Sequence, residues 1–318
     1  MPRPLIIAGL MLGLASHAFG LNILLTNDDG LTSNLKALYE ALKADGHNVI
    51  VSVPCSGQSG RGAAILMYSS DKIEPTNDLQ IAAEGGCHNG AAGIGAPAAG
   101  PFTREGFTNG DYHYVHGSPM LATLYGLDIL APERWGRDPD LVLSGPNEGQ
   151  NVGTLINSSG TVANVQVAAA RGIPSIALSA GLNTVDNKTL SDPDSTTVAQ
   201  LTLKLLHELQ KQVAGKKVPL LPEGVALNVN FPTDVKPDSR FAFSRIGSFT
   251  LYQPQFITTP RIGPSFSVND SSSAGKSQQE DEAVVSQTRI SVTPMQVSFD
   301  HDEAVQSWLR QHLQNLFE

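Results

Sequence analysis

Short apolar runs, each ending in a polar turn and followed by a helical pattern, constrain the fold of this chain more than any other feature. Residues 22–26 form such a run, which stops at Asn-Asp-Asp-Gly. Apolar residues then recur at helical spacing between residues 35 and 42. A β-branched run, residues 48–53, follows and ends at Pro54. This order of strand, helix and strand is typical of the opening of a parallel sheet.

The same alternation continues through most of the chain. The sequence predicts further strands at 112–115, 140–144, 173–179 and 226–230, and helices at 119–130, 159–172 and 196–213. A chain of 318 residues with 41% hydrophobic side chains is long enough to bury one large core. We therefore predict an α/β fold: a three-layer, Rossmann-like, mostly parallel sheet with a C-terminal extension.

The first 20 residues differ from the rest. A single positive charge precedes a short apolar run, and small residues ending Ala18-Phe19-Gly20 follow it. This layout predicts a signal peptide over residues 1–20, because the run is shorter than the roughly 20 residues that span a membrane. We expect an exported protein, periplasmic or secreted, with no membrane association after cleavage. The alternative is a buried helix or strand of the fold.

Residues 83–110 show no apolar period of either kind, and we interpret them as a long surface loop inserted into a core of residues 21–244. Cys55 and Cys87 are the two cysteines of the chain. Export would permit them to form a disulfide. The sequence does not decide between that pair and two unpaired thiols in separate loops.

The pattern weakens in residues 245–318, which we interpret as a C-terminal extension. Within it, residues 270–282 read as an exposed loop and residues 289–297 as an alternating segment typical of a strand. A final helix carries an apolar stripe along one side. We interpret this stripe as core packing rather than a partner site; it consists of Val305, Trp308, Leu309 and Leu316.

The charge of the chain limits its partners. Its net charge is −9, without a basic cluster, which argues against binding to a nucleic-acid duplex. A small anionic substrate would need a local cation, and a divalent metal ion is the simplest source of one.

Polar side chains follow several of the predicted strands. Asp28 and Asp29 follow the first, Ser59 the second and Asn147 the run at 140–144. The carboxyl ends of parallel strands meet at one edge of a sheet, where ligands bind. Adjacent carboxylates repel unless a cation lies between them. An all-oxygen set of this kind suits Mg²⁺, Mn²⁺ or Ca²⁺. The alternative is that each loop is a turn without function.

A second candidate site begins the helix at residue 159. Ser159, Gly160 and Thr161 would offer backbone N–H groups, two hydroxyls and the positive end of the helix dipole. These groups suit a phosphate. Ordinary N-capping by Ser or Thr is the alternative.

Four ordered motifs resemble the SurE survival-protein family: Ile-Leu-Leu-Thr-Asn-Asp-Asp-Gly at 23–30, Gln-Ser-Gly at 58–60, Asp-Leu-Val-Leu-Ser-Gly-Pro-Asn-Glu-Gly-Gln-Asn-Val-Gly at 140–153 and Ser-Gly-Thr-Val at 159–162. The resemblance covers about residues 21–235. It implies a metal-dependent 5'/3'-nucleotidase or broad acid phosphatase acting on nucleoside monophosphates or other phosphomonoesters. It also implies a homodimer or homotetramer, with residues 245–318 as the oligomerisation arm and Ser-Val-Thr-Pro at 291–294 in a closing strand.

The same resemblance implies a role for each matching residue. Asp28, Asp29, Ser59 and Asn147 would be the metal ligands, Ser159, Gly160 and Thr161 would border the phosphate pocket, and Asn151 would help to line it. Pro146, the sequence His-Gly-Ser-Pro at 116–119 and the insertion depart from the common pattern. These departures look like an exported branch of the family.

The mechanism we expect is attack on phosphorus by a water that the metal positions. Asp28 or Asp29 would accept its proton or act as the nucleophile. His113 and His116 are possible general acids, although an isolated histidine near a strand end is more often structural. Two rival functions are a nucleotide-binding module without catalysis and a serine hydrolase; the chain lacks the Gly-x-Ser-x-Gly turn of the latter.

Overall fold

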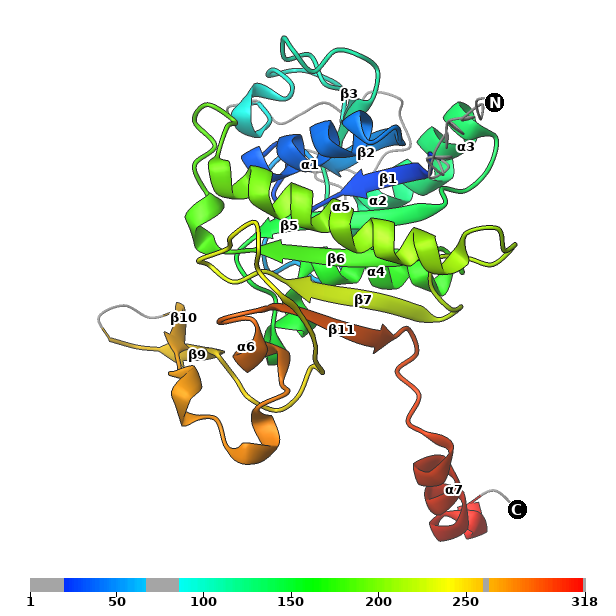
Figure 1. The fold of residues 1–318 in the computed structure, drawn as a ribbon, viewed down its shortest axis with the longest axis vertical. Helices are drawn as coiled ribbons and strands as arrows, with labels where there is room; N and C mark the ends of the chain where they lie inside the picture. Colours follow the sequence, from blue (N-terminus) through cyan, green and yellow to red (C-terminus); the bar gives the residue numbers. More distant parts are fainter. Residues whose placement is uncertain (1–19, 67–85, 260–262, 317–318) are drawn as a thin grey trace, which may run out of the picture.

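The computed structural model describes residues 20–66, 86–259 and 263–316 (Figure 1). The expected signal peptide therefore lies outside the described residues, apart from Gly20. A nine-stranded sheet runs through the molecule in the order β3-β4-β2-β1-β5-β6-β7-β11-β8. The strands of this sheet are β1 (Asn22–Thr26), β2 (Asn48–Pro54), β3 (Ala99–Pro101), β4 (Tyr112–Val115), β5 (Leu141–Glu148), β6 (Ser175–Ala180), β7 (Val225–Asn230), β8 (Phe241–Phe243) and β11 (Ile290–Gln296).

Most neighbouring strands are parallel, as the sequence predicts. The run from β4 through β2, β1, β5 and β6 to β7 is parallel throughout. Strand β3 is antiparallel to β4, and β11 is antiparallel to β7. The prediction of a closing strand near the C-terminus is confirmed by β11.

Helices cover both faces of the sheet and give three layers (Figure 1). Helices α1 (Ser33–Ala44) and α5 (Pro193–Val213) lie on one face. Helices α2 (Pro119–Tyr125), α3 (Ala131–Trp135) and α4 (Gly160–Ala170) belong to the other, and a π-helical segment, Gly126–Leu130, joins α2 to α3. The predicted helix at 119–130 therefore continues to Trp135.

Strand β1 shows why both faces need helices. Ile23 and Leu25 pack in the cluster that contains α1 and α5, whereas Leu24 packs with Leu127 and Ala168 on the opposite face. All three β1 side chains are fully buried. A strand with apolar side chains on both faces is typical of the centre of a parallel sheet.

The strand order reverses at β1. From β1 the chain moves through β2 to β4 on one side, and the later strands β5, β6 and β7 extend the sheet on the other. Ligands of open α/β sheets bind at such a reversal, beyond the carboxyl ends of the strands. The loops that follow β1 and β5 lie there.

The insertion is more than the surface loop that we predicted. Its residues 99–101 form β3, and Ala91, Ala92, Phe102 and Phe107 are buried. The Phe102 ring stacks on Tyr112 of β4 at 5.5 Å. Small side chains and two aromatic rings can cover the edge of the sheet without any helical or strand period, and for this reason the pattern was missed.

Cys55 and Cys87 form a disulfide, with their Cα atoms 4.6 Å apart. It joins the end of β2 to the start of the insertion. The question that the sequence left open is thus answered in favour of the pair.

The C-terminal extension contradicts two predictions. Asp281 and Glu282 at the start of α6 (Glu282–Val285) are fully buried, although the sequence predicts an exposed loop there. Helix α7 (Glu303–His312) has no buried residue, so its apolar stripe does not pack in the core as we interpreted. In Figure 1, α7 stands away from the sheet, beyond β11.

The extension also contains a separate hairpin of two antiparallel strands, β9 (Tyr252–Ile257) and β10 (Gly263–Val268). Within the described ranges, no helix is both long enough and apolar enough to cross a membrane.

Candidate metal and phosphate site

The acidic turn after β1 is built by Asn27. Its side-chain amide donates to the Gly30 carbonyl at 2.7 Å, and the Gly30 N–H donates to Asn27 Oδ1 at 3.0 Å. Gly30 has φ +79°, and a Cβ there would lie 2.9 Å from the Pro54 carbonyl oxygen. Asparagine and glycine therefore fix this turn, which presents Asp28 and Asp29 at the edge of the sheet.

Asp28 points toward the N-terminus of α4. The Thr161 hydroxyl donates to Asp28 Oδ1 at 2.6 Å. A Cβ on Gly160 would lie 2.7 Å from Asp28 Cβ and 2.8 Å from Pro119 Cγ, so only glycine fits at this contact. The start of α4 is consequently packed directly against the first carboxylate.

Asp29 joins the other two loops. It accepts hydrogen bonds from the Glu148 N–H at 3.2 Å and from the Ser59 hydroxyl at 3.4 Å. The Gln58 N–H also donates to the Asp28 carbonyl at 2.7 Å. The loops that follow β1 and β2 thus meet the end of β5, as the sequence predicts.

Asn147 lies within β5 rather than in a loop after it, because the strand continues to Glu148 across a register shift. Its amide Nδ2 donates to the Gly149 carbonyl at 2.7 Å. Its Oδ1 is buried and has no hydrogen-bond partner. An unpaired buried acceptor is costly unless a ligand completes it. A bound cation would do so.

The raised pKa values of the carboxyl groups also favour a cation at the site. Burial, together with the charge of Asp29, raises the pKa of Asp28 to about 8. Burial likewise raises the pKa of Asp29, and burial raises that of Glu148 to about 7, assisted by repulsion from Asp29. Three carboxyl groups with raised pKa values at one edge of a sheet are a candidate functional site.

The donor set fits a hard divalent cation. No group of three or more His, Cys, Asp and Glu side chains in the described parts of the chain could hold a metal. The candidate set is different in kind, because it joins two carboxylates to a hydroxyl and an amide oxygen. Oxygen-only sets of this composition suit Mg²⁺, Mn²⁺ or Ca²⁺.

The residues predicted to form the phosphate pocket have two different roles. The Ser159 hydroxyl accepts from the Val162 N–H at 3.1 Å and so caps α4, the ordinary role that the sequence left open. Asn151 donates to the hydroxyls of Thr161 at 3.3 Å and Ser179 at 3.0 Å. It is buried behind Thr161, which it supports.

A chain of hydrogen bonds continues from Asn151 into the C-terminal extension. Asn228 donates both to the Asn151 carbonyl and to Glu282 Oε2, each at 2.9 Å. Glu282 Oε1 accepts from the Gly153 N–H at 3.0 Å. A buried carboxyl of the extension thus holds the 151–153 loop in place. Nothing in the polar sequence around Glu282 indicated this contact.

The histidines are arranged differently from our expectation. His113 faces the α2 and α3 side of the sheet, where it contacts the Tyr125 ring and lines a cavity with Leu130 and Arg134. His116 follows β4, and burial lowers its pKa. His88, which the sequence reading missed, lies beside Gly57 at the edge of the acidic site. Its position next to Cys87 in the sequence is the feature that could have pointed to it.

Comparisons with known proteins concern the family and the fold of the chain. The family model described as survival protein SurE matches residues 23–251. An acid phosphatase of Yarrowia lipolytica is 32% identical over 227 residues, which cover 69% of this chain and 59% of that protein. A 5'-nucleotidase SurE of Methanocella arvoryzae is 32% identical over 229 residues, or 70% of this chain and 71% of the relative. The SurE protein of Aquifex aeolicus shares the fold, with a TM-score of 0.62 at 22% identity, over 91% of this chain and 98% of that structure.

Proposed function

Because the chain belongs to the SurE family, we propose that it is a metal-dependent phosphomonoester hydrolase that acts on nucleoside monophosphates. The relatives named acid phosphatase and 5'-nucleotidase support this class of reaction. The alignments span 59% and 71% of those two relatives. The substrate class is therefore part of the proposal.

One observation carries the proposal most directly: Asn147 Oδ1 is buried and unpartnered, and the next residue of the strand, Glu148, donates its N–H to the Asp29 carboxylate. Asp28, Asp29, Ser59 and Asn147 would hold a divalent cation, Mg²⁺, Mn²⁺ or Ca²⁺. When bound, such an ion supplies the positive charge that polarises a phosphoryl group and lowers the pKa of water.

The chain's own residues would orient the substrate and move a proton. The N-terminus of α4, packed on Asp28, offers backbone N–H groups to the phosphate. Thr161 fixes the orientation of the Asp28 carboxylate by its hydrogen bond. Asp28 or Asp29 would accept the proton of the attacking water.

The test is phosphate release from AMP and other nucleoside monophosphates by the mature protein, with Mg²⁺, Mn²⁺ or Ca²⁺ and after chelation. We expect chelation to abolish turnover, and Asp28→Asn and Asp29→Asn to lose at least about 100-fold in kcat, because each removes one negative charge from the metal site. Asp238→Asn, on an exposed carboxylate, is the matched control. Full activity of both site variants in the presence of chelator would contradict the proposal.

Metal binding has a readout that is independent of turnover. A cation that binds the folded state alone raises the Tm. We expect Mn²⁺ to raise the Tm of the wild type and of Asp238→Asn, but not of Asp29→Asn. Retained nucleotide binding without phosphate release would favour the rival binding module. Inactivation by a serine-reactive inhibitor would favour the rival hydrolase.

Export is part of the same proposal. The layout of residues 1–20 and the Cys55–Cys87 disulfide support a periplasmic or secreted protein, since disulfides persist in oxidising compartments. Cell fractionation, with N-terminal sequencing of the mature chain, tests it. A mature chain that still begins at Met1 in a reducing compartment would contradict export.

A further inference from the structure

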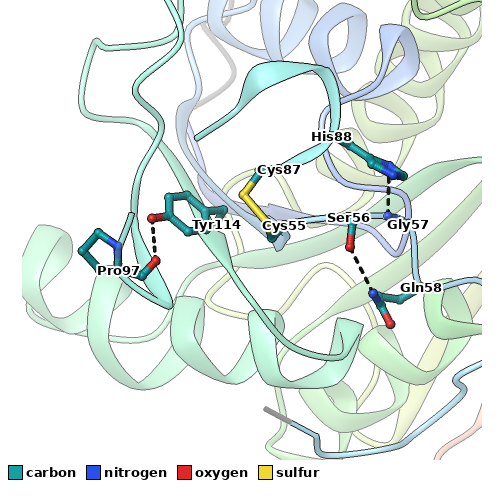
Figure 2. Close-up of a disulfide and its surroundings, with 8 residues drawn as sticks. All are labelled: Cys55, Ser56, Gly57, Gln58, Cys87, His88, Pro97 and Tyr114. Carbon is teal, nitrogen blue, oxygen red and sulfur yellow. Dashed lines mark hydrogen bonds between the residues drawn. A yellow bond between two sulfur atoms is a disulfide. The ribbon is translucent and has the colours of Figure 1, made fainter. Parts of the chain in front are cut away.

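A short segment of the insertion, Cys87 to Asn89, joins two of the loops that carry the candidate ligands. Cys87 is bonded to Cys55, and the His88 N–H donates to the Cys55 carbonyl at 2.8 Å. The Asn89 side chain donates to the Leu31 carbonyl at 2.6 Å, directly after the acidic turn. Figure 2 shows Cys87 and His88 lying over Cys55, Ser56 and Gly57. The segment is therefore fixed relative to both loops.

The His88 ring is held in one orientation by the loop beneath it. The Gly57 N–H donates to His88 Nδ1 at 3.1 Å. A neutral ring that accepts at Nδ1 carries its proton on Nε2. The residue is exposed, so the Nε2–H is free of the buried hydrogen-bond network of the core. The insertion thus presents a fixed donor at the surface.

This donor lies on the Asp29 side of the site. Gly57 separates the two residues: a Cβ built on it would be 3.3 Å from His88 Cε1 and 4.0 Å from the Asp29 carbonyl oxygen. His88 is thus near enough to act on the same bound molecule as Asp29.

The α4 N-terminus lies on the other side, against Asp28. If the phosphoryl group faces the helix, the rest of the ester extends toward the opposite rim. The His88 ring lies on the Asp29 side, next to Gly57. Its Nε2–H would meet hydroxyl and ring oxygens of the alcohol part of the substrate, such as those of a ribose.

We propose that His88 is a specificity-determining residue, which donates an Nε2–H hydrogen bond to the alcohol part of the phosphomonoester. The proposal rests on the proposed function of the site. It assigns to the insertion a preference for substrates with hydrogen-bond acceptors next to the ester, over substrates with apolar leaving groups.

His88→Asn is the informative variant. The Asn Oδ1 can still accept the Gly57 N–H, whereas the Nε2–H donor is gone. We expect kcat/KM for AMP to fall about 3- to 10-fold, the range for a lost hydrogen bond between neutral groups. The kcat/KM for p-nitrophenyl phosphate, whose aromatic leaving group offers no comparable acceptor, should stay close to that of the wild type.

Two further measurements separate this role from a structural one. Because inorganic phosphate lacks the alcohol part, its Kd from calorimetry should be the same in wild type and His88→Asn. The metal concentration for half-maximal activity should also be unchanged. His88→Ala, which loses the Gly57 contact as well, should show the same loss of AMP preference. His207→Asn, on α5 far along the chain, is the control.

An equal loss for both esters, or no loss for either, would overturn the proposal. So would a weaker phosphate Kd in His88→Asn. The proposed function would stand in each of these cases, as long as the wild type releases phosphate in a metal-dependent manner. A wild type that is inactive on both esters would instead refute the proposed function itself.

Discussion

Gly160 is important to the site because it has no side chain, which lets the start of α4 pack closely on Asp28. A Cβ at this position would meet Asp28 and Pro119 at less than 3 Å. Gly160→Ala must therefore displace either the carboxylate or the start of α2. Misplacement of a catalytic group by about 1 Å can cost about 100-fold in rate. We expect a loss of this order in kcat/KM for a nucleoside monophosphate.

Gly93→Ala is the matched control for this prediction, because a Cβ there would have open space and no positive φ to strain it. The control should keep the wild-type rate and Tm. If Gly160→Ala also keeps the wild-type rate, the close packing of α4 on Asp28 is not needed for activity.

The sequence predicted in part which residues meet at the candidate metal site. Asp28, Asp29, Ser59 and Asn147 could be grouped because parallel strands end at one edge of a sheet. The structure places the Ser59 hydroxyl and the Glu148 N–H, next to Asn147 in the chain, within hydrogen-bond distance of Asp29. That they bind a metal stays a prediction. The bond from Thr161 to Asp28 joins residues 133 positions apart. It depends on how α4 packs, which no local pattern specifies.

Among the elements, the strands and helices of the core followed their periods closely, and the extension did not. Helix α6 was missed because it is a single turn of four residues, too short to show a period. Its burial combines hydrogen bonds to Glu282 with the packing of Ala283 in a small apolar cluster. The insertion was misread as a surface loop for the related reason that small residues and scattered aromatics cover an edge strand.

The buried carboxyl of α6 leads to a prediction about pH. Burial raises the pKa of Glu282 from 4.5 to about 8. The folded state therefore favours the protonated form, so the stability from this group is complete below about pH 4.5 and is lost as the pH rises toward 8. Glu282→Gln cannot ionise and escapes this loss.

We expect the free energy of unfolding of Glu282→Gln, relative to the wild type, to improve by about 2 kcal/mol or more between pH 5 and pH 8. The substitution also lowers the free energy of unfolding by an amount that does not depend on pH, because the new amide N–H₂ would face the Asn228 donor. Urea denaturation of metal-free protein at several pH values measures the difference. A difference that is independent of pH would show that Glu282 does not hold its proton in the folded protein.

Considered as one molecule, the chain leaves its last helix without a place in its own core. Trp308 is 56% exposed, Leu309 43%, Leu313 41% and Leu316 76%. We propose that α7 packs against a second copy of the chain, in the homodimer or homotetramer that the family resemblance implies. Contiguous apolar patches that are exposed on a protein surface often mark sites of interaction with a partner.

Leu309→Asp should then shift the mass measured by light scattering from an oligomer to a monomer, since it places a charge in the middle of the stripe. Ser307→Asp, on the opposite side of α7, should keep the wild-type mass. A monomeric wild type at micromolar concentration would contradict this role for the helix.

The family and the fold class, an α/β protein with a mostly parallel sheet, were predictable from the sequence and are confirmed. Four motifs at strand ends and helix starts were enough, because each one needs particular residues at a turn. The position of α7 was not predictable from the sequence. A helix with an apolar side has the same sequence pattern whether it packs on its own core or on another chain.

The bond between Asn228 and Glu282 has a consequence for how such proteins can evolve. It joins β7, in the sheet, to α6, in the extension, and either residue alone would leave a buried polar group unpaired. A change at one position should therefore persist only with a matching change at the other. Among homologous sequences these two positions should vary together, and a hybrid that takes its core and its C-terminal part from different relatives should work best when both come from the same parent.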